Sequence, residues 1–241
     1  MNAVKKKVVA VIPVYNEEEF IENTINNIKK IKLIDEIVVV NDGSTDRTRE
    51  IVSNLNVTLI NVDKNRGKGY AINKAIKNCD FDYLVLLDGD LGKTSDEAIK
   101  IIEPALNNEA DVIIARFQKP KKKGGFGLVK KLANRGVYFY TGKDISSTLS
   151  GQRVYNKKSI SSIKYIPNRY GVEVAMTVGV LRNGFTIKEV DVEMTHRETE
   201  RNLEGFIHRG RQFINILITL IDLAFRRWIN VCFKYSYIIS K

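Results

Sequence analysis

Apolar and helix-patterned segments alternate along the first part of the chain. The run 8–14 is apolar throughout and rich in β-branched residues, and apolar residues at helical spacing follow over 20–31. Further apolar runs at 36–40, 57–62 and 83–87 are separated by helical patterns near 46–54 and 68–77. Strands that are apolar on both faces and alternate with helices predict an α/β fold, with a mostly parallel, Rossmann-like sheet covered by helices.

The second part of the chain is less regular. The basic, glycine-containing stretch 119–131 predicts a surface loop or the start of a surface helix, 171–185 reads as a helix, and 186–196 alternates like a strand. Residues 203–241 have the pattern of an amphipathic helical tail. Within it, the apolar stretch 213–225 is shorter than the roughly 20 residues that a bilayer span requires.

Charge divides the chain unequally. Residues 1–115 contain 15 basic and 19 acidic residues, whereas 116–241 contain 24 and 9, which concentrates the net charge of +11 in the second half. That half is suited to an anionic partner such as a phosphorylated substrate or a membrane surface. No nucleic-acid-binding motif accompanies the charge, so nucleic acid is not expected as a partner. Two distant cysteines, Cys79 and Cys232, argue against a disulfide framework and favour a cytoplasmic setting.

Polar residues follow each predicted strand. Asn16 and Glu17 come after the first strand and Asp42 after the second. Asn65–Gly69 follow the third strand, and Asp88 with Asp90 follow the fourth. In a parallel sheet these ends meet at one edge, where ligands bind. Two carboxylates two residues apart favour a Mg²⁺ or Mn²⁺ site. The alternative is a turn whose carboxylates are simply solvated.

The segments IPVYNEE, VVNDGSTD, NRGKGYAIN and LLDGD, in this order, resemble the nucleotide-binding half of family 2 glycosyltransferases with the GT-A fold. The resemblance implies that a nucleotide diphosphate sugar is held by Pro13, Tyr15, Glu17, Asp42 and Ser44. It places Lys68 near the nucleotide or diphosphate, Asp88 on the sugar or ribose, and Asp90 on the metal. In isolation, Lys68 is equally well explained as a solvated lysine at a helix start.

Downstream, LSGQRVY and YGVEV resemble the acceptor region of two groups of related glycosyltransferases. These are the polyprenyl- and dolichyl-phosphate sugar transferases, and the glucosyl-3-phosphoglycerate and mannosylglycerate synthases. The resemblance places Gly151 and Arg153 at the acceptor, with Arg153 gripping an acceptor phosphate, and makes His196 a second metal ligand. The chain departs from the lipid-phosphate group at Ser147, where aspartate is common, and at Gln152, where phenylalanine is usual.

The resulting hypothesis is an inverting, metal-dependent transfer of a hexose from a nucleotide diphosphate sugar. A UDP-sugar is favoured as the donor over a GDP-sugar. Asp90 and Glu173 are the catalytic candidates, with Glu173 as general base for a hydroxyl acceptor or as an orienting group for a phosphate acceptor. A glutamate in the first turn of a helix is also favoured by the helix dipole alone. The alternatives are a soluble glucosyl-3-phosphoglycerate-type synthase and a non-catalytic nucleotide- or anion-binding module.

The expected organisation is a GT-A domain over 1–202, with a nucleotide-sugar half (1–115) and an acceptor half (116–202), followed by the tail 203–241. The acceptor is expected to be phosphorylated or lipid-linked, in cell-envelope glycan synthesis at the inner face of the cell membrane. The tail is then a peripheral membrane contact. Alternatively, its apolar stripe packs on the catalytic domain or in a homodimer.

Overall fold

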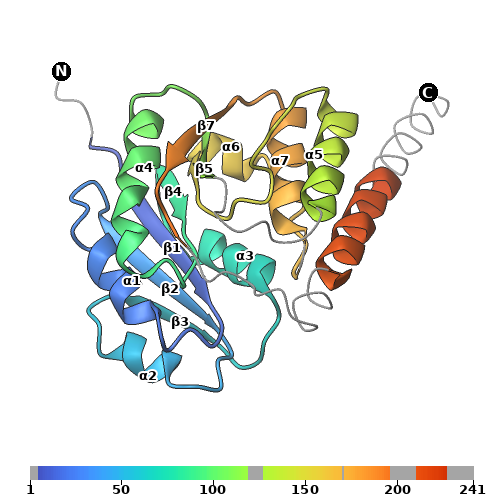
Figure 1. Cartoon of the computed structure of the whole chain (residues 1–241). Coiled ribbons are helices and arrows are strands. Elements are labelled where there is room, and N and C mark those ends of the chain that lie inside the picture. The colour runs from blue at the N-terminus through green and yellow to red at the C-terminus, as the bar shows by residue number, and fades with distance from the viewer. Residues whose placement is uncertain (1–4, 119–126, 170, 196–209, 227–241) are drawn as a thin grey trace, which may run out of the picture.

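The computed structural model describes residues 5–118, 127–169, 171–195 and 210–226. In these residues the chain builds a seven-stranded sheet in the order β3-β2-β1-β4-β6-β5-β7 (Figure 1). Neighbouring strands are parallel except at β6, which runs antiparallel to both β4 and β5. The strands are β1 Val8–Val14, β2 Glu36–Asp42, β3 Thr58–Val62, β4 Tyr83–Leu86, β5 Val112–Phe117, β6 Arg153–Asn156 and β7 Ile187–Val192.

Helices cover both faces of the sheet. The helices are α1 Ile21–Ile28, α2 Thr48–Ser53, α3 Lys68–Asn78, the 3₁₀ helix η1 Gly92–Ala98, α4 Ile99–Leu106, α5 Leu128–Thr141, α6 Lys157–Ser161 and α7 Val172–Arg182. The mostly parallel α/β sheet predicted from the apolar runs is confirmed, and the first four strands lie where those runs stand. Strands β5 and β6 and helices α4 and α6 had no counterpart in the sequence prediction.

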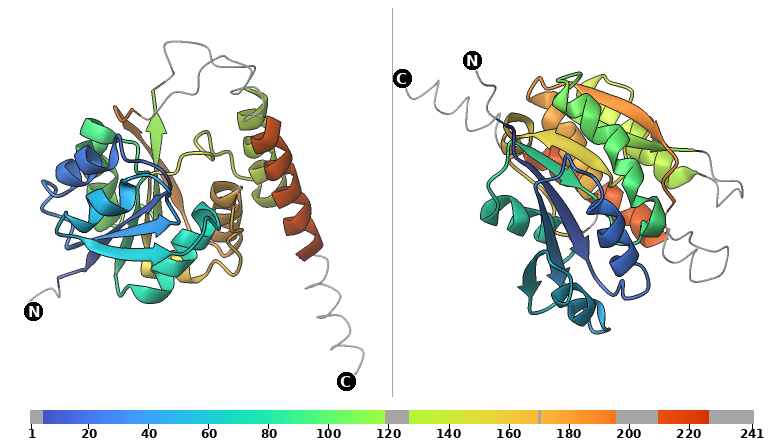
Figure 2. Two further views of the ribbon diagram at one scale, coloured as in Figure 1. Left: turned by 90° about the horizontal axis from the view of Figure 1, so that it is seen from below. Right: turned by 90° about the vertical axis from the view of Figure 1, so that its left-hand side faces the viewer.

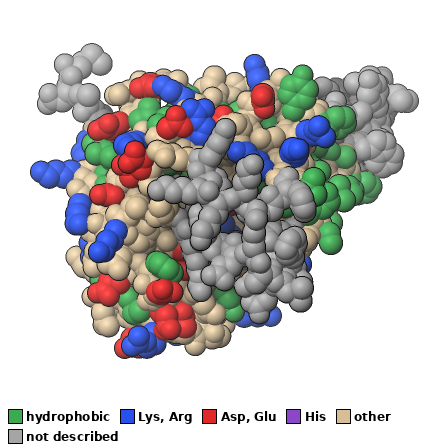
Figure 3. Space-filling model, viewed as in Figure 1, with side chains coloured by type: hydrophobic (Ala, Val, Ile, Leu, Met, Phe, Trp, Pro, Cys, Tyr) green, Lys and Arg blue, Asp and Glu red, His purple; other side chains and the backbone are tan. Residues whose placement is uncertain are grey.

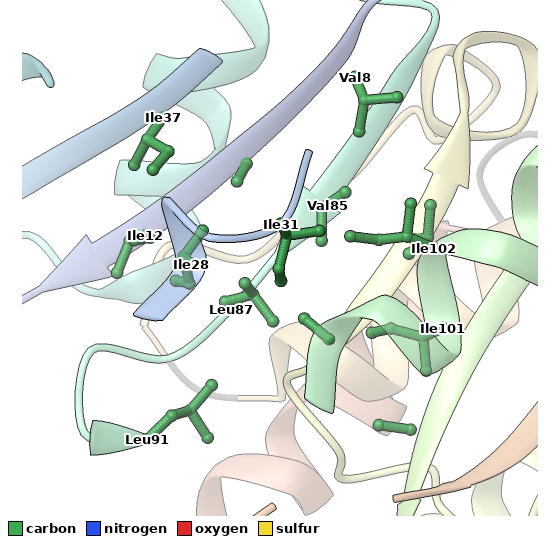
Figure 4. Close-up of a cluster of buried hydrophobic side chains, with 14 of the residues drawn as sticks. Val8, Ile12, Ile28, Ile31, Ile37, Val85, Leu87, Leu91, Ile101 and Ile102 are labelled. Atoms are coloured by element: carbon green, nitrogen blue, oxygen red, sulfur yellow. The ribbon is translucent and has the colours of Figure 1, made fainter. Parts of the chain in front are cut away.

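Strand β1 shows why its sequence is apolar at successive positions. Val8, Ala10 and Ile12 point into a core with α1 and α4, which Figure 4 shows in close-up. Val9 and Val11 point to the opposite face, where a second core contains residues of α3, α5 and α7. All five side chains are almost fully buried, so the strand lacks the polar alternation of a one-sided sheet.

The start of α3 is locked to the segment that leads into α7. A Cβ atom at Gly69 would lie 1.8 Å from the carbonyl oxygen of Pro167, so only glycine permits this approach. The amide of Tyr70 also donates to the carbonyl of Asn168, at 3.1 Å. These contacts join the first and second halves of the chain at the edge formed by the carboxyl ends of the parallel strands.

Residues 210–226 form a helix, here called the C-terminal helical segment, which lies beside α5 (Figures 1 and 2). The Tyr140 hydroxyl donates to the Leu220 carbonyl at 2.7 Å, and a Cβ atom at Gly136 would lie 2.6 Å from the Leu220 side chain. Thr219 packs against Gly171 at the start of α7, where the backbone has φ +70°. The inward side of the segment therefore packs on the domain, as one of the two expected alternatives stated. In the described part of the chain, no helix is both long and apolar enough to cross a membrane.

A carboxylate on β7 holds the loop that precedes β6. Glu189 accepts hydrogen bonds from the Ser146 amide (3.1 Å), the Ser146 hydroxyl (2.8 Å) and the Ser147 amide (2.6 Å). Burial by itself would raise the pKa of the Glu189 carboxyl, but these hydrogen bonds outweigh it and hold the pKa below its ordinary value. The carboxylate form is thus the one that the folded protein stabilises.

We expect Glu189→Gln to lower the free energy of unfolding by about 1 kcal/mol at pH 7, because an amide offers a single weaker acceptor to these donors. A lowered pKa contributes stability above the ordinary value of 4.5 and loses it as the pH falls through the folded-state pKa. The difference between the two proteins should therefore shrink below about pH 4.5 in urea melts. Glu193→Gln, at an exposed position next to the same strand, is the control. Equal stability of Glu189→Gln and the unchanged protein at pH 7 would contradict this role.

Candidate active site

The loops after β1 and β2 are tied together at the sheet edge. The Asn16 amide donates to the Ser44 hydroxyl at 3.0 Å, and the Asn16 side-chain oxygen accepts from the Thr45 amide at 2.8 Å. Asn16 has φ 57°, a left-handed conformation that asparagine tolerates. Tyr15 beside it is 43% exposed. The structure therefore brings Tyr15 and Ser44, two of the residues expected at the nucleotide, to neighbouring loops.

Asp42 organises the loop that leads into α3. Its carboxylate is buried and accepts hydrogen bonds from the Arg66 amide, at 3.0 and 3.1 Å, and from the Gly67 amide, at 2.6 Å. Gly67 has φ 101°, in the region open chiefly to glycine. Asp42 thus sets the start of α3, at which Lys68 is the first residue.

Pro13 and Glu17 are both half-buried near the end of β1. The Glu17 amide donates to the Thr48 hydroxyl at 2.8 Å, which ties this loop to the first turn of α2. The residues expected to hold the nucleotide therefore occupy one continuous edge of the sheet, formed by the ends of β1 and β2.

Four side chains from four separate places in the chain meet at the centre of this edge. Lys68 Nζ lies 2.6 Å from Asp88 Oδ1 and 3.0 Å from Glu173 Oε1, and Gln152 Nε2 donates to Asp88 Oδ2 at 2.7 Å. We call Lys68, Asp88, Gln152 and Glu173 the Lys68 cluster. Its three charged side chains are 19–31% exposed, so the pairs are partly shielded yet open to solvent.

The charges of the cluster support one another. Burial lowers the pKa of the Lys68 ammonium, but the negative charges of Asp88 and Glu173, with a hydrogen bond to each, more than compensate and raise it above the ordinary value. Lys68 therefore remains an ammonium group throughout the physiological pH range. It is bound to two carboxylates, and it is not the solvated helix-start lysine that was the alternative.

Gly151 leaves the space that the cluster needs. A Cβ atom at this position would lie 2.5 Å from Lys68 Nζ and 2.7 Å from Asp88 Oδ2. Both distances are shorter than van der Waals contact, so any side chain here would displace the ammonium or the carboxylate. The position expected at the acceptor thus borders the Lys68 cluster directly.

Arg153 supports the cluster from inside the protein. Its side chain is 1% exposed, and its guanidinium donates to the carbonyls of Ser150 (2.7 Å) and Thr148 (2.5 Å). It also donates to the Thr177 hydroxyl at 2.9 Å and the Glu173 carbonyl at 3.3 Å. The expected grip on an acceptor phosphate does not agree with this placement, because protein oxygens occupy a guanidinium that is closed to solvent. Arg153 instead positions the first turn of α7 and the loop before β6.

The turn after β4 carries the expected metal-binding carboxylates. Asp88 and Asp90 are both half-buried, and Asp88 is bonded to Lys68 and Gln152. Among the described residues, no group of three or more His, Cys, Asp or Glu side chains is arranged for a metal ion. His196 lies outside the described residues. Hard carboxylate oxygens on one turn fit Mg²⁺ or Mn²⁺ of the kind that takes further ligands from substrate phosphates.

Gln152 is the site residue that sequence reasoning did not assign. It stood out only as a departure from the family pattern, yet its side chain is 2% exposed and binds Asp88. A signal was available, because Gln152 lies between Gly151 and Arg153, both already expected at the acceptor site. The partner of Gln152 is 64 residues away in sequence, and only the pairing of β4 with β6 brings the two together.

Comparison with known proteins places this geometry in a family. Residues 9–163 match the family model described as glycosyl transferase family 2. The UDP-N-acetylglucosamine–dolichyl-phosphate N-acetylglucosaminyltransferase of Methanococcus voltae is 27% identical over 220 residues, which are 80% of this chain and 87% of that protein. The undecaprenyl-phosphate 4-deoxy-4-formamido-L-arabinose transferase of Pectobacterium carotovorum is 27% identical over 232 residues, 90% of this chain and 66% of that protein.

The fold agrees with solved structures. Glucosyl-3-phosphoglycerate synthase from Mycobacterium tuberculosis, in complex with Mn²⁺, UDP and phosphoglyceric acid, superposes with a TM-score of 0.76. The two chains are 22% identical, and the match covers 90% of this chain and 78% of that one. The matched family model spans well over half of the chain and includes β1 to β4 and the loop with Gln152. The chain therefore belongs to glycosyl transferase family 2, and it is a glycosyltransferase with a GT-A fold.

Proposed function

We propose that this enzyme transfers a hexose from a nucleotide diphosphate sugar, with UDP-sugars favoured over GDP-sugars, to a polyprenyl-type lipid phosphate. The observation that carries the proposal is the Lys68 cluster, where one ammonium and two carboxylates meet, one of them Asp88, two residues before Asp90. In this assignment Pro13, Tyr15, Glu17, Asp42 and Ser44 hold the nucleotide, Asp42 partly through the Arg66–Gly67 backbone that it orders.

The charges at the edge of the sheet favour a donor that arrives with a divalent cation. Lys68 and the buried Arg153 behind the cluster together balance Asp88 and Glu173, so these four side chains leave no net positive charge to neutralise a bare diphosphate. We assign Asp90 and His196 as the ligands of Mg²⁺ or Mn²⁺. When bound, such an ion supplies neutralisation of the charge on the departing diphosphate.

The acceptor assignment rests on Glu173 and on the relatives. Glu173 Oε1 forms an ion pair with the Lys68 ammonium, so a hydroxyl acceptor that uses Glu173 as a base would have to reach the second oxygen of this carboxylate, Oε2. A phosphate acceptor is already anionic and needs no such base. Its oxygen forms the new bond to the sugar C1 atom from the opposite face, while the bond from C1 to the diphosphate breaks and its electron pair leaves with the diphosphate. The configuration at C1 is inverted. The relative from Methanococcus voltae carries dolichyl phosphate in its name.

The proposed setting is cell-envelope glycan synthesis at the cytoplasmic face of the membrane, with the protein bound peripherally. Within the proposed domain 1–202, residues 1–115 bind the donor and 116–202 shape the acceptor side. Of the tail 203–241, the described residues 210–226 pack on this domain. Gly151 lies at the acceptor side of the Lys68 cluster. Arg153 acts as a positioning residue behind it.

The experiment that tests this function is a transfer screen. UDP- and GDP-sugars are offered with Mn²⁺ or Mg²⁺ against a short-chain polyprenyl phosphate, and separately against 3-phosphoglycerate. Transfer to the polyprenyl phosphate supports the proposal. Transfer to 3-phosphoglycerate alone would establish the soluble synthase instead. Binding of a nucleotide diphosphate without turnover of any donor would leave a non-catalytic binding module.

Removal of the metal or of its proposed ligand should stop transfer. We expect EDTA, or Asp90→Asn, to lower kcat by at least about a hundredfold, because the charge on the leaving diphosphate is then uncompensated. Asp96→Asn, at an exposed position in η1, is the matched control and should keep full activity. Full activity of Asp90→Asn in EDTA would refute the metal-dependent mechanism.

Glu173→Gln should separate the two acceptor chemistries. With a phosphate acceptor we expect kcat to change by less than about tenfold, since no general base is needed. A hydroxyl acceptor that relies on Glu173 as base would instead lose about a hundredfold or more in kcat. Steady-state kinetics with both acceptors measures this. A loss of that size with polyprenyl phosphate would show that Glu173 does more than orient the site.

Gly151→Ala should disable the Lys68 cluster without unfolding the protein. The added methyl group would displace the Lys68 ammonium or the Asp88 carboxylate, and a misplaced reacting group costs at least about tenfold in kcat/KM. Gly210→Ala, where a Cβ atom meets nothing within 4 Å, is the matched control. We expect similar melting temperatures for both variants. Wild-type kcat/KM in Gly151→Ala would contradict a function for the cluster.

A further inference from the structure

Exposed apolar side chains gather on two neighbouring helices. Of the ten large hydrophobic residues exposed in the described part of the chain, eight lie on α5 or the C-terminal helical segment. Six of them are referred to below as the apolar face: Leu128, Phe139, Ile214, Ile218, Ile221 and Phe225. Phe139 is 77% exposed and Ile221 60%. Figure 3 shows hydrophobic side chains gathered over this edge of the molecule.

The C-terminal helical segment is apolar on two opposite sides. Ile216 and Leu220 are buried against the domain, and Leu223 packs on the same core. The residues of the apolar face in this segment are spaced by four, three and four positions, which places them on one helical stripe directed away from the domain. A helix that only had to pack on the domain would carry polar residues on that stripe.

The two helices enclose a groove of about 540 Å³. Leu128, Phe139 and Ile221 line it, together with Lys131 and Arg135 at the same surface. The apolar face is therefore continuous from α5 to the C-terminal helical segment, and it borders basic side chains.

Charge indicates what covers this surface. The two helices carry five basic residues, Lys130, Lys131, Arg135, Arg211 and Arg226, and a single acidic one, Asp222. Asp222 is 3.1 Å from Arg226 and so is already paired. An exposed apolar stripe bordered by basic residues is the pattern of helices that lie in the interface of an anionic bilayer. A second copy of the chain would bring two positively charged surfaces together, which costs energy.

We propose that the apolar face docks on the surface of a bilayer that contains anionic lipids. The apolar side chains enter the boundary between headgroups and acyl chains, and Lys130, Lys131 and Arg135 contact lipid phosphates. This proposal rests on the proposed function, because it explains how a lipid-linked acceptor reaches the enzyme. It assigns the contact to two described helices with named side chains.

The docking surface is joined to the active site. Thr219, on the inward side of the C-terminal helical segment, packs against Gly171, and Gly171 immediately precedes the helix that carries Glu173. Asn134 on α5 donates to the Ser146 carbonyl at 3.3 Å, in the loop that leads to Gly151. Docking through these helices therefore holds the acceptor side of the Lys68 cluster close to the bilayer.

The test is cosedimentation of the full chain with phosphatidylcholine vesicles and with vesicles that also contain phosphatidylglycerol. We expect binding to the anionic vesicles that weakens at high salt. Phe139→Ser/Ile218→Ser should weaken that binding at least about tenfold, because two apolar side chains that would enter the bilayer are lost. Ile99→Ser, an exposed apolar residue on α4, is the matched control and should bind normally.

A charge variant tests the same face independently of its packing. Lys131→Gln/Arg135→Gln should weaken binding to anionic vesicles about tenfold, whereas Lys29→Gln/Lys32→Gln, on the opposite layer of helices, should not. Normal binding of both docking variants would overturn the proposal. Failure of the unaltered chain to bind either kind of vesicle would also overturn it. This holds whether the apolar face is covered by a second copy in a dimer or by residues of the same chain in a monomer.

Transfer to a short, water-soluble polyprenyl phosphate without vesicles separates this proposal from the proposed function. The docking variants should keep their activity in that assay and lose it with long-chain acceptor in anionic vesicles. Vesicle binding without transfer to any lipid phosphate would refute the function and leave the docking surface intact. Transfer to the short acceptor without vesicle binding would support the function and refute the docking surface.

Discussion

The ion pair network of Lys68 is the interaction on which the candidate active site depends. The ammonium joins Asp88, at the end of β4, to Glu173, in the first turn of α7, and so connects the two parts of the chain at one point. Taking three charges partly out of water is unfavourable unless each has a partner at short distance. The site therefore needs the surrounding geometry, including the missing side chain at Gly151, to keep these distances.

That geometry comes from the way loops at the sheet edge bind each other. Asp42 orders the backbone before α3, and Gly69 allows α3 to approach Pro167. Arg153 binds the start of α7 from inside the protein. Each contact uses a backbone group or a buried polar group that would be costly to leave unpaired. The cluster is thus positioned by rigid elements, with Gln152 fixing the second oxygen of Asp88.

The same helices that support the site also shape the outer surface. Gly136 and Gly171 let the C-terminal helical segment approach α5 and α7 closely, which buries its inward side. Its outward side remains apolar, although burial against the domain does not require this. A structural role accounts for one side of the helix, and the proposed contact with a lipid surface would account for the other.

The sequence by itself determined the side of this protein that we propose to bind the nucleotide. Strands β1 to β4 are continuous apolar runs because both faces of the sheet are covered, and the residues that follow them meet wherever parallel strands end. The short-range pattern of apolar and polar residues was sufficient to predict this part of the fold.

Only the tertiary structure decided the proposed acceptor side. Strand β6 is four residues long and starts with the buried Arg153, so it lacks the apolar pattern of a strand, and its pairing with β4 brings Gln152 to Asp88. The same burial directs the Arg153 guanidinium into the protein and away from an acceptor. The sequence also could not tell which side of the C-terminal helical segment is buried, because both of its sides are apolar and the choice depends on contacts with residues far away along the chain.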